Sequence, residues 1–215
     1  MSFFENLSRS TALDRDQMIG IPIIQRALRG AVSRAEYLDY LGQAYHHVKH
    51  TVPLLMACGA RLPERLNWLR EGIAKYIEEE LGHEEWILDD IAAAGGNPER
   101  VRTSRPHAAT EIMVSYAYDT VHRRNPAGFF GMVYVLEGTS VSLAHHAADA
   151  IQQELGLPTT AFRYLRSHGS VDQDHIMFLE ALVNRLDNPA DKEEVLHCAT
   201  MFFRLYGDLF GSVVQ

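Results

Sequence analysis

The chain contains little cysteine and a small share of basic residues. Its 215 residues include two cysteines, Cys58 and Cys198, which lie far apart in segments of helical character. Two isolated thiols do not form a disulfide framework or a thiolate metal site, so we expect both to be small core residues. The 28 acidic and 20 basic residues give a net charge of -8. Because contacts to phosphates need clustered Lys and Arg, no nucleic-acid partner is expected.

The sequence also lacks several common signatures. The start has no basic region followed by an apolar stretch, and no segment approaches the roughly 18 apolar residues of a membrane span. We therefore expect a soluble cytoplasmic protein with no membrane partner. The sequence contains no Gly-x-Ser-x-Gly elbow, phosphate-binding loop or dinucleotide fingerprint. The sequence therefore gives no support for a serine hydrolase or a nucleotide-binding protein.

The pattern that is present is helical. Apolar residues recur with a 3.6-residue period, and no stretch alternates as a strand does. A capping box at Ser33 and Glu36, and the pair Gly156 and Pro158 after a long apolar segment, mark helix ends. No repeat or linker divides the chain, so we expect a single all-α domain over 1–215, a bundle of about seven or more helices. The expected helices cover residues 14–28, 33–58 with a bend at Pro53, 63–95, 110–123, 126–155, 162–167, 170–187 and from 189 onward.

Carboxylates and histidines stand together on two of these helices. Glu79 and Glu80 precede His83 by four and three residues, so either carboxylate can share a helix face with it. Farther along, Glu137 interrupts an apolar run. A charge in such a place is costly to bury unless it is paired or bound to a metal ion.

A third group follows at residues 168–175. Asp172 stands three residues before His175 and four residues after His168, although Gly169 predicts a kink between His168 and Asp172. Carboxylates and imidazoles from several helices are the ligands of di-iron and di-manganese sites in helical bundles. Oxygen donors combined with imidazole favour Fe or Mn. The three groups together therefore predict a site for two metal ions.

Each group by itself also has a simpler interpretation. The acidic run at 78–90 is also typical of a solvated helix face, and Glu137 is also consistent with a carboxylate held by an Arg or by the hydroxyl of Tyr134. Joint occurrence on three helices favours the metal site. Large apolar side chains near these residues are expected mainly to pack in the core, and partly to line a substrate tunnel: Trp86, Phe130, Met132 and Phe178.

Another histidine group offers an alternative. His46 and His50 share a helix face, with His47 between them. A histidine on an early helix is also a candidate axial ligand of a haem. In that case added haem would give a Soret band that the His46→Ala or His47→Ala variant lacks.

The chain resembles the haem-oxygenase-like family of di-metal oxidases and oxygenases, which is related in fold to thiaminase II and pyrroloquinoline-quinone synthase. The resemblance covers about residues 40–185, and the order and spacing of three motifs carry it. These are Glu80-Leu81-Gly82-His83, Leu136-Glu137-Gly138 and His168-x3-Asp172-x2-His175.

The resemblance implies a fold, a ligand set and an activity. It implies an O2-activating non-haem iron oxidoreductase with two Fe ions, or Mn in their place, O2 as cosubstrate and a small organic substrate such as a fatty acid, an aromatic acid or an amine. Tyr76 and Tyr134 are candidate catalytic residues near the metals, and homodimers are common in this fold. The alternatives are a non-catalytic helical binding protein and a haem oxygenase. The implied metal ligands are Glu80, His83, Glu137, His168, Asp172 and His175.

Two departures qualify the resemblance. In part of the family the first carboxylate stands two turns before the first histidine, and here that position is Tyr76. The ligand is then Glu80 or Glu79, and the Glu-x-x-His spacing favours Glu80. Thiaminase II would require a nucleophilic cysteine, and neither Cys58 nor Cys198 stands in a matching motif.

Overall fold

The computed structural model describes residues 1–213, apart from the side chains of residues 169–173. Within the described residues every regular element is a helix, which confirms the predicted all-α class. The elements are α1 (Phe3–Ser10), α2 (Ala12–Ile19), α3 (Pro22–Ala27), α4 (Arg34–Val48), α5 (Thr51–Arg61), η1 (Glu64–Leu66), α6 (Asn67–Glu80), α7 (His83–Ala93), α8 (Pro98–Thr103), α9 (Ala108–Arg123), η2 (Pro126–Gly128), α10 (Phe129–Leu155), η3 (Thr159–Ala161), α11 (Arg163–Val183) and α12 (Pro189–Gly211).

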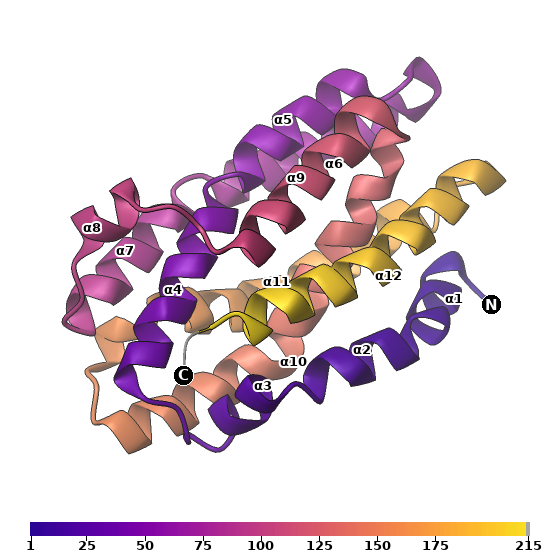
Figure 1. Ribbon diagram of the computed structural model, residues 1–215. Helices are drawn as coiled ribbons and strands as arrows, with labels where there is room; N and C mark the ends of the chain where they lie inside the picture. The colour runs from indigo at the N-terminus through magenta and orange to yellow at the C-terminus, as the bar shows by residue number, and fades with distance from the viewer. Residues whose placement is uncertain (214–215) are drawn as a thin grey trace.

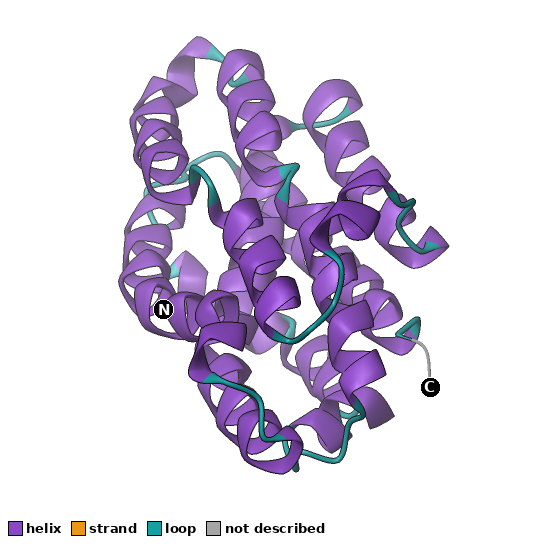
Figure 2. Ribbon diagram, turned by 90° about the vertical axis from the view of Figure 1, so that its left-hand side faces the viewer, coloured by secondary structure: helices purple, strands orange, loops and turns teal. Residues whose placement is uncertain are grey.

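The long helix α10 lies at the centre of the packing. It packs against α11 and α12, while α4 packs against α7, and α5 packs against α6 and α9. Figure 1 shows α12 crossing in front of α10 and α11, with α5, α6 and α9 on one side and the short helices α1 to α3 along the opposite edge. Short loops join the helices, as Figure 2 shows.

Helix α10 departs from one sequence expectation. By length and composition, the 30-residue segment Pro126–Leu155 is able to cross a membrane, because its best 18-residue window has a mean hydropathy of 1.3. The expectation that no segment approaches a membrane span is therefore wrong. Sixty-seven per cent of this window is buried inside the fold, since α10 packs against α9, α11 and α12. This apolar surface belongs to the core of the bundle.

The core consists of two apolar clusters. One contains Tyr76, residues 129–135 and Leu179, and the other contains Ile87, Ala144 and Leu165, each with its neighbours. Helices α10 and α11 run from one cluster to the other, and the chain also passes between the clusters where α6 ends and α7 begins. The candidate metal ligands predicted from the sequence lie at these boundaries between the two clusters.

Several helix ends follow the predicted signals, and others do not. Helices α9 and α10 have the predicted ends within two or three residues, and Gly156 ends α10 in the left-handed conformation at φ 61°. The helix expected over 14–28 is broken at Gly20 before Pro22, and the helix expected over 33–58 is broken at residues 49–50. Conversely, the break expected at 168–169 is absent, because α11 is continuous. A single glycine costs a helix only about 1 kcal/mol, and packing of α11 on α10 supports the helix.

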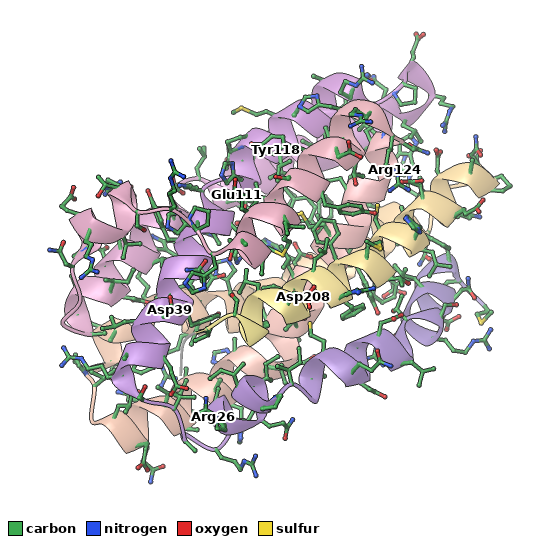
Figure 3. The ribbon with its side chains drawn as sticks, in the orientation of Figure 1. Arg26, Asp39, Glu111, Tyr118, Arg124 and Asp208 are labelled. Atoms are coloured by element: carbon green, nitrogen blue, oxygen red, sulfur yellow. The ribbon has the colours of Figure 1, made fainter. Side chains whose placement is uncertain are left out.

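The predicted capping box at the start of α4 is present. Ser33 Oγ accepts a hydrogen bond from the Glu36 backbone N–H at 3.2 Å, and Glu36 accepts one from the Ser33 backbone N–H at 2.6 Å. Arg26, labelled on α3 in Figure 3, donates a further hydrogen bond to Glu36. The Arg26 hydrogen bond outweighs the effect of burial and lowers the pKa of Glu36 to about 2. This buried carboxylate therefore ties α3 to α4.

We predict that Glu36→Gln destabilises the fold by on the order of 2 kcal/mol at pH 7, because a charge-assisted hydrogen bond is lost. The pKa of Glu36 falls from 4.5 to about 2 on folding, so its charge stabilises the folded chain above pH 4.5. That contribution is lost as the pH falls toward 2. Urea unfolding of wild type and variant between pH 7 and the acid limit of folding measures the difference.

The matched control is Glu99→Gln. The Glu99 side chain is 78% exposed in its ion pair with Arg102, and exposed pairs contribute little to stability. Two results would contradict this role of Glu36 between α3 and α4. One is an equal decrease in the free energy of unfolding in both variants, and the other is a decrease in Glu36→Gln that does not become smaller in acid.

Candidate metal centre

The first pair of candidate ligands is formed by a turn between two helices. Helix α6 ends at Glu80 and α7 begins at His83; Leu81 between them is extended, and Gly82 has φ 87°. His83 Nδ1 lies 3.1 Å from Glu80 Oε2. The prediction of one helix over 63–95 is therefore wrong at this point. The carboxylate and the imidazole meet through a left-handed glycine, a conformation that other residues adopt at a cost.

His168 on α11 completes a first group. One ligand atom each from Glu80, His83 and His168 can be chosen so that all three lie within 4.8 Å of one another. His168 Nδ1 lies 3.2 Å from the Tyr164 carbonyl oxygen. A histidine that donates one ring N–H to a backbone carbonyl keeps the other nitrogen as an acceptor, which is the usual arrangement of a metal-binding imidazole.

A second group lies beside the first. His175 Nδ1 is 3.5 Å from Glu137 Oε1, and His175 Nε2 is 3.0 Å from Glu79 Oε2. The Tyr76 hydroxyl is 3.4 Å from Glu137 Oε2 and 3.4 Å from the His175 carbonyl oxygen. Glu137 and His175 are buried. This group therefore joins α6, α10 and α11.

Glu80 lies between the two groups, whereas Glu79 lies at the edge. Glu80 Oε2 faces His83, and its Oε1 is 4.0 Å from His175 Nδ1. The Glu80 side chain is 11% exposed, while that of Glu79 is 33% exposed and also lies 3.7 Å from Lys75 Nζ. Glu80, which the Glu-x-x-His spacing favours, is thus the more buried of the two carboxylates and the one that faces both groups.

The charges explain why this arrangement suits cations. Burial by itself would raise the pKa of Glu80, but the hydrogen bond from His83 and the charges of His168, His83 and His175 lower it. The carboxylate is therefore held ionised in a largely buried site. Buried carboxylates are normally paired or bound to metal ions, and carboxylate oxygens with imidazole nitrogens are donors that Fe and Mn accept. The residues present fit such a group.

Two of the predicted site residues are not brought to this cluster by the described contacts. Asp172 lies among the side chains that the structure does not describe, although its backbone is in α11 between His168 and His175. Tyr134 packs edge-on against Phe4 at 5.6 Å and Phe203 at 6.1 Å between ring centroids. Its place in the apolar packing gives no support to the catalytic role predicted for it.

The structure adds His47, which the sequence presented only as a haem-ligand alternative. It lines a cavity of about 60 Å³ beside the cluster, together with Tyr164, Tyr206 and Ser140. Burial lowers the pKa of His47 to about 3, so the ring is neutral. Its Nδ1 atom is buried and, among the described residues, has no hydrogen-bond partner. Helical periodicity gives no signal for it, because every residue of α4 from Gly42 onward is buried.

The other two histidines of that group are engaged elsewhere. His46 Nε2 lies 2.9 Å from Ser104 Oγ, and His46 Nδ1 lies 3.2 Å from Lys49 Nζ. His50 Nδ1 lies 3.1 Å from the Tyr118 hydroxyl. Their shared face therefore points to α8 and α9 rather than to the carboxylates.

Comparison with known proteins gives one match to a family profile. The profile of a family described as iron-containing redox enzymes matches residues 38–207. No curated protein gives a significant match to the sequence.

Solved structures with this fold carry different descriptions. A domain of unknown function with a haem oxygenase-like fold from Shewanella denitrificans is 26% identical, with a TM-score of 0.86 over 98% of this chain and 91% of that one. A TenA homologue from Pseudomonas syringae is 12% identical, with a TM-score of 0.81 over 97% and 91%. The haem oxygenase of Leptospira interrogans is 16% identical, with a TM-score of 0.72 over 98% of each chain. The predicted haem-oxygenase-like fold is thus confirmed.

We predict that Gly82→Ala destabilises the fold by about 1–2 kcal/mol, because an L side chain is strained at positive φ. The site around a Cβ at this position is open, so the effect reports backbone strain rather than a clash. Urea unfolding measures it.

Gly42→Ala is the matched control, because Gly42 is a helical glycine whose added Cβ would make an ordinary 3.9 Å contact with Val101. It should stabilise α4 by about 0.5–1 kcal/mol. If the free energy of unfolding changed in the same direction in both variants, the role assigned to the turn at Gly82 would be contradicted.

Proposed function

Because this chain belongs to the family of iron-containing redox enzymes, we propose that it is a non-haem di-iron oxidase or oxygenase that uses O2 to act on a small organic substrate. One observation carries the proposal. Carboxylates and histidines from α6, α7, α10 and α11 meet between the two apolar clusters, and their two groups are joined through Glu80.

The proposed ligands are those implied by the family resemblance. Two Fe(II) ions, or Mn(II) in their place, would supply the electrons and the binding positions that O2 requires. Glu80, with an oxygen toward each group, is preferred over Glu79 as the first carboxylate. The full proposed set is Glu80, His83, Glu137, His168, Asp172 and His175.

Residues around this set have roles of their own. The Tyr76 hydroxyl orients Glu137 and contacts the backbone at His175, which holds α10 and α11 in register at the site. The Tyr164 carbonyl fixes the ring of His168. Apolar neighbours such as Met132 and Leu136 line the adjoining cavity and limit water near the reacting atoms. These contacts support a pre-organised centre rather than a surface patch.

A haem site fits the charges less well. A porphyrin dianion already balances the charge of a ferrous iron, so a ferrous haem would add no net positive charge to offset Glu80 and Glu137. His46 is also committed to Ser104 and Lys49. His47 is the histidine of α4 that lines the same cavity as the carboxylates.

The non-catalytic alternative would keep the fold and bind at most one ion. A small-molecule substrate, a cytoplasmic location and homodimerisation remain predictions.

Glu137→Ala should abolish binding of two Fe or Mn ions per chain. The remaining donors can neither balance the charge of two ions nor hold both ions in place. Elemental analysis of protein from cells supplied with iron and manganese measures the content, and far-ultraviolet circular dichroism should show little loss of helix.

Glu78→Ala serves as the control, since Glu78 is an exposed carboxylate on the same α6 as Glu80. It should keep the wild-type metal content. Full occupancy in Glu137→Ala, or no metal in the wild type, would contradict the di-iron proposal.

Tyr76→Phe should lower metal affinity or O2 consumption by on the order of tenfold, because groups that orient metal ligands usually have effects of this size. Tyr134→Phe, which removes the same atom from a residue packed between Phe4 and Phe203, should leave both unchanged. Competition with a chromophoric chelator measures the metal affinity, and an oxygen electrode measures the O2 consumption. The reverse order of effects would instead favour Tyr134 as the functional tyrosine.

A further inference from the structure

Helix α11 receives its N-terminal cap from another helix. Its own N-cap residue is Phe162, which makes no side-chain capping hydrogen bond. The first backbone N–H groups of a helix have no partner within the helix, so another group must accept their hydrogen bonds. Asp90 of α7 does so, because its Oδ1 lies 2.9 Å from the Arg163 N atom and its Oδ2 lies 2.8 Å from the Tyr164 N atom. Both oxygens of one carboxylate therefore join α7 to α11.

The Asp90 carboxylate is buried at a cost in stability. Its side chain is 0% exposed. Burial raises the pKa of Asp90 to about 6, and the hydrogen bonds from the backbone N–H groups of Tyr164 and Arg163 offset this effect only in part. At pH 7 the group is therefore ionised, and its charge lowers the stability of the fold. Residues that cost stability in this way are expected at functional sites.

Each end of this contact leads to one histidine of the first group. On α7, Asp90 lies about two turns after His83, so both residues are on the same side of the helix. On α11, Tyr164 stands one turn before His168. The Tyr164 carbonyl oxygen lies 3.2 Å from His168 Nδ1, and the two rings pack at 4.6 Å between centroids. Asp90 thus fixes the backbone of the residue that orients His168.

The two histidine rings meet between α7 and α11. The centroids of His83 and His168 are 4.9 Å apart. One ligand atom of each lies within 4.8 Å of the other and of a Glu80 ligand atom. Glu80 and His83 come from the two ends of one turn, whereas His168 comes from α11. Because donors must be held to about 0.5 Å for a metal site, the position of α11 on α7 decides whether all three donors reach one ion.

Trp86 lies at the same junction of the two helices. Its ring is 4.0 Å from the His83 ring between centroids, at an interplanar angle of 33°. The guanidinium carbon of Arg163 lies 4.3 Å from the centroid of the Trp86 ring. Arg163 is also one of the two residues whose N–H groups donate to Asp90. A change in the separation of α7 from the start of α11 therefore alters the surroundings of the Trp86 ring.

We propose that Asp90 is a positioning residue of the metal centre. It ties the start of α11 to α7 and thereby holds His168 opposite His83, so that the donors of the first group can bind one ion. The second group is held in a different way, through the Tyr76 hydroxyl. The inference rests on the proposed function only in naming a metal ion as the ligand of these donors.

The tie between the two helices is tested first in the metal-free protein. Asp90→Asn preserves the shape of the side chain but removes its charge and one of its two acceptor oxygens. The amide protons of Arg163 and Tyr164 should then exchange with solvent at least tenfold faster. In a Trp68→Phe background Trp86 is the only tryptophan, and its fluorescence emission should shift, because the groups packed on its ring move. Unchanged exchange and emission would overturn the inference.

Asp191→Asn provides the comparison. Asp191 is also 0% exposed, and it accepts hydrogen bonds from Arg65 and Asn125 near the start of α12. Its substitution should leave the amide exchange of residues 163–164 and the emission of Trp86 unchanged. Asp90→Ser keeps one acceptor oxygen on a shorter side chain, and it repeats the test if Asp90→Asn does not fold.

The second test titrates the full-length chain with Co(II), whose visible absorption depends on its ligands. Wild type should bind two ions, and His83→Ala supplies the spectrum of a chain in which only the second group binds an ion. In Asp90→Asn the ion at the first group should bind at least tenfold more weakly, and the ion at the second group should bind within twofold of wild type. Asp191→Asn should bind both ions as wild type does.

The outcomes distinguish this inference from the proposed function. Equal weakening at both groups in Asp90→Asn, or the same weakening in Asp191→Asn, would overturn the inference. Two ions bound by Asp90→Asn with wild-type affinity would contradict this inference alone. A wild type that binds no Co(II), together with faster amide exchange and shifted Trp86 emission in Asp90→Asn, would contradict the di-iron proposal alone.

Discussion

The structure depends on how carboxylates are accommodated between two apolar clusters. Glu80 and Glu137 lie where chain segments pass from one cluster to the other, and the ion pairs found for them join them to histidines. Imidazoles alone compensate such charges weakly, whereas divalent cations compensate them well. In the proposed metal-bound state divalent cations would balance this polar centre, and the surrounding helices would hold the donors in place.

The same constraint explains the geometry of the elements. Helix α10 carries Glu137 through the centre, and α11 brings His168 to the first group and His175, two turns farther on, to the second. The break at Gly82 turns His83 back toward Glu80. Tyr76 then links Glu137 to the backbone of α11.

Much of this could be predicted from the sequence, because helical periodicity and capping signals are local. The all-α class, the capping box at Ser33 and the ends of α10 are examples. The break at Gly82 and the continuity of α11 through Gly169 could not, since packing between helices decides whether one glycine interrupts a helix. Spacing grouped the candidate ligands and favoured Glu80 over Glu79, but the turn through which Glu80 meets His83 could not be predicted. The place of His47 beside the carboxylates depends on contacts between distant segments, which periodicity does not report.

The central claim is that this centre binds two metal ions without a porphyrin. Anaerobic calorimetric titration of the metal-free chain with Fe(II) tests it most directly. The account predicts saturation at two equivalents, accompanied by a rise in the melting temperature, because binding compensates the buried carboxylates. Saturation at one equivalent or none, together with tight stoichiometric binding of haem, would contradict it.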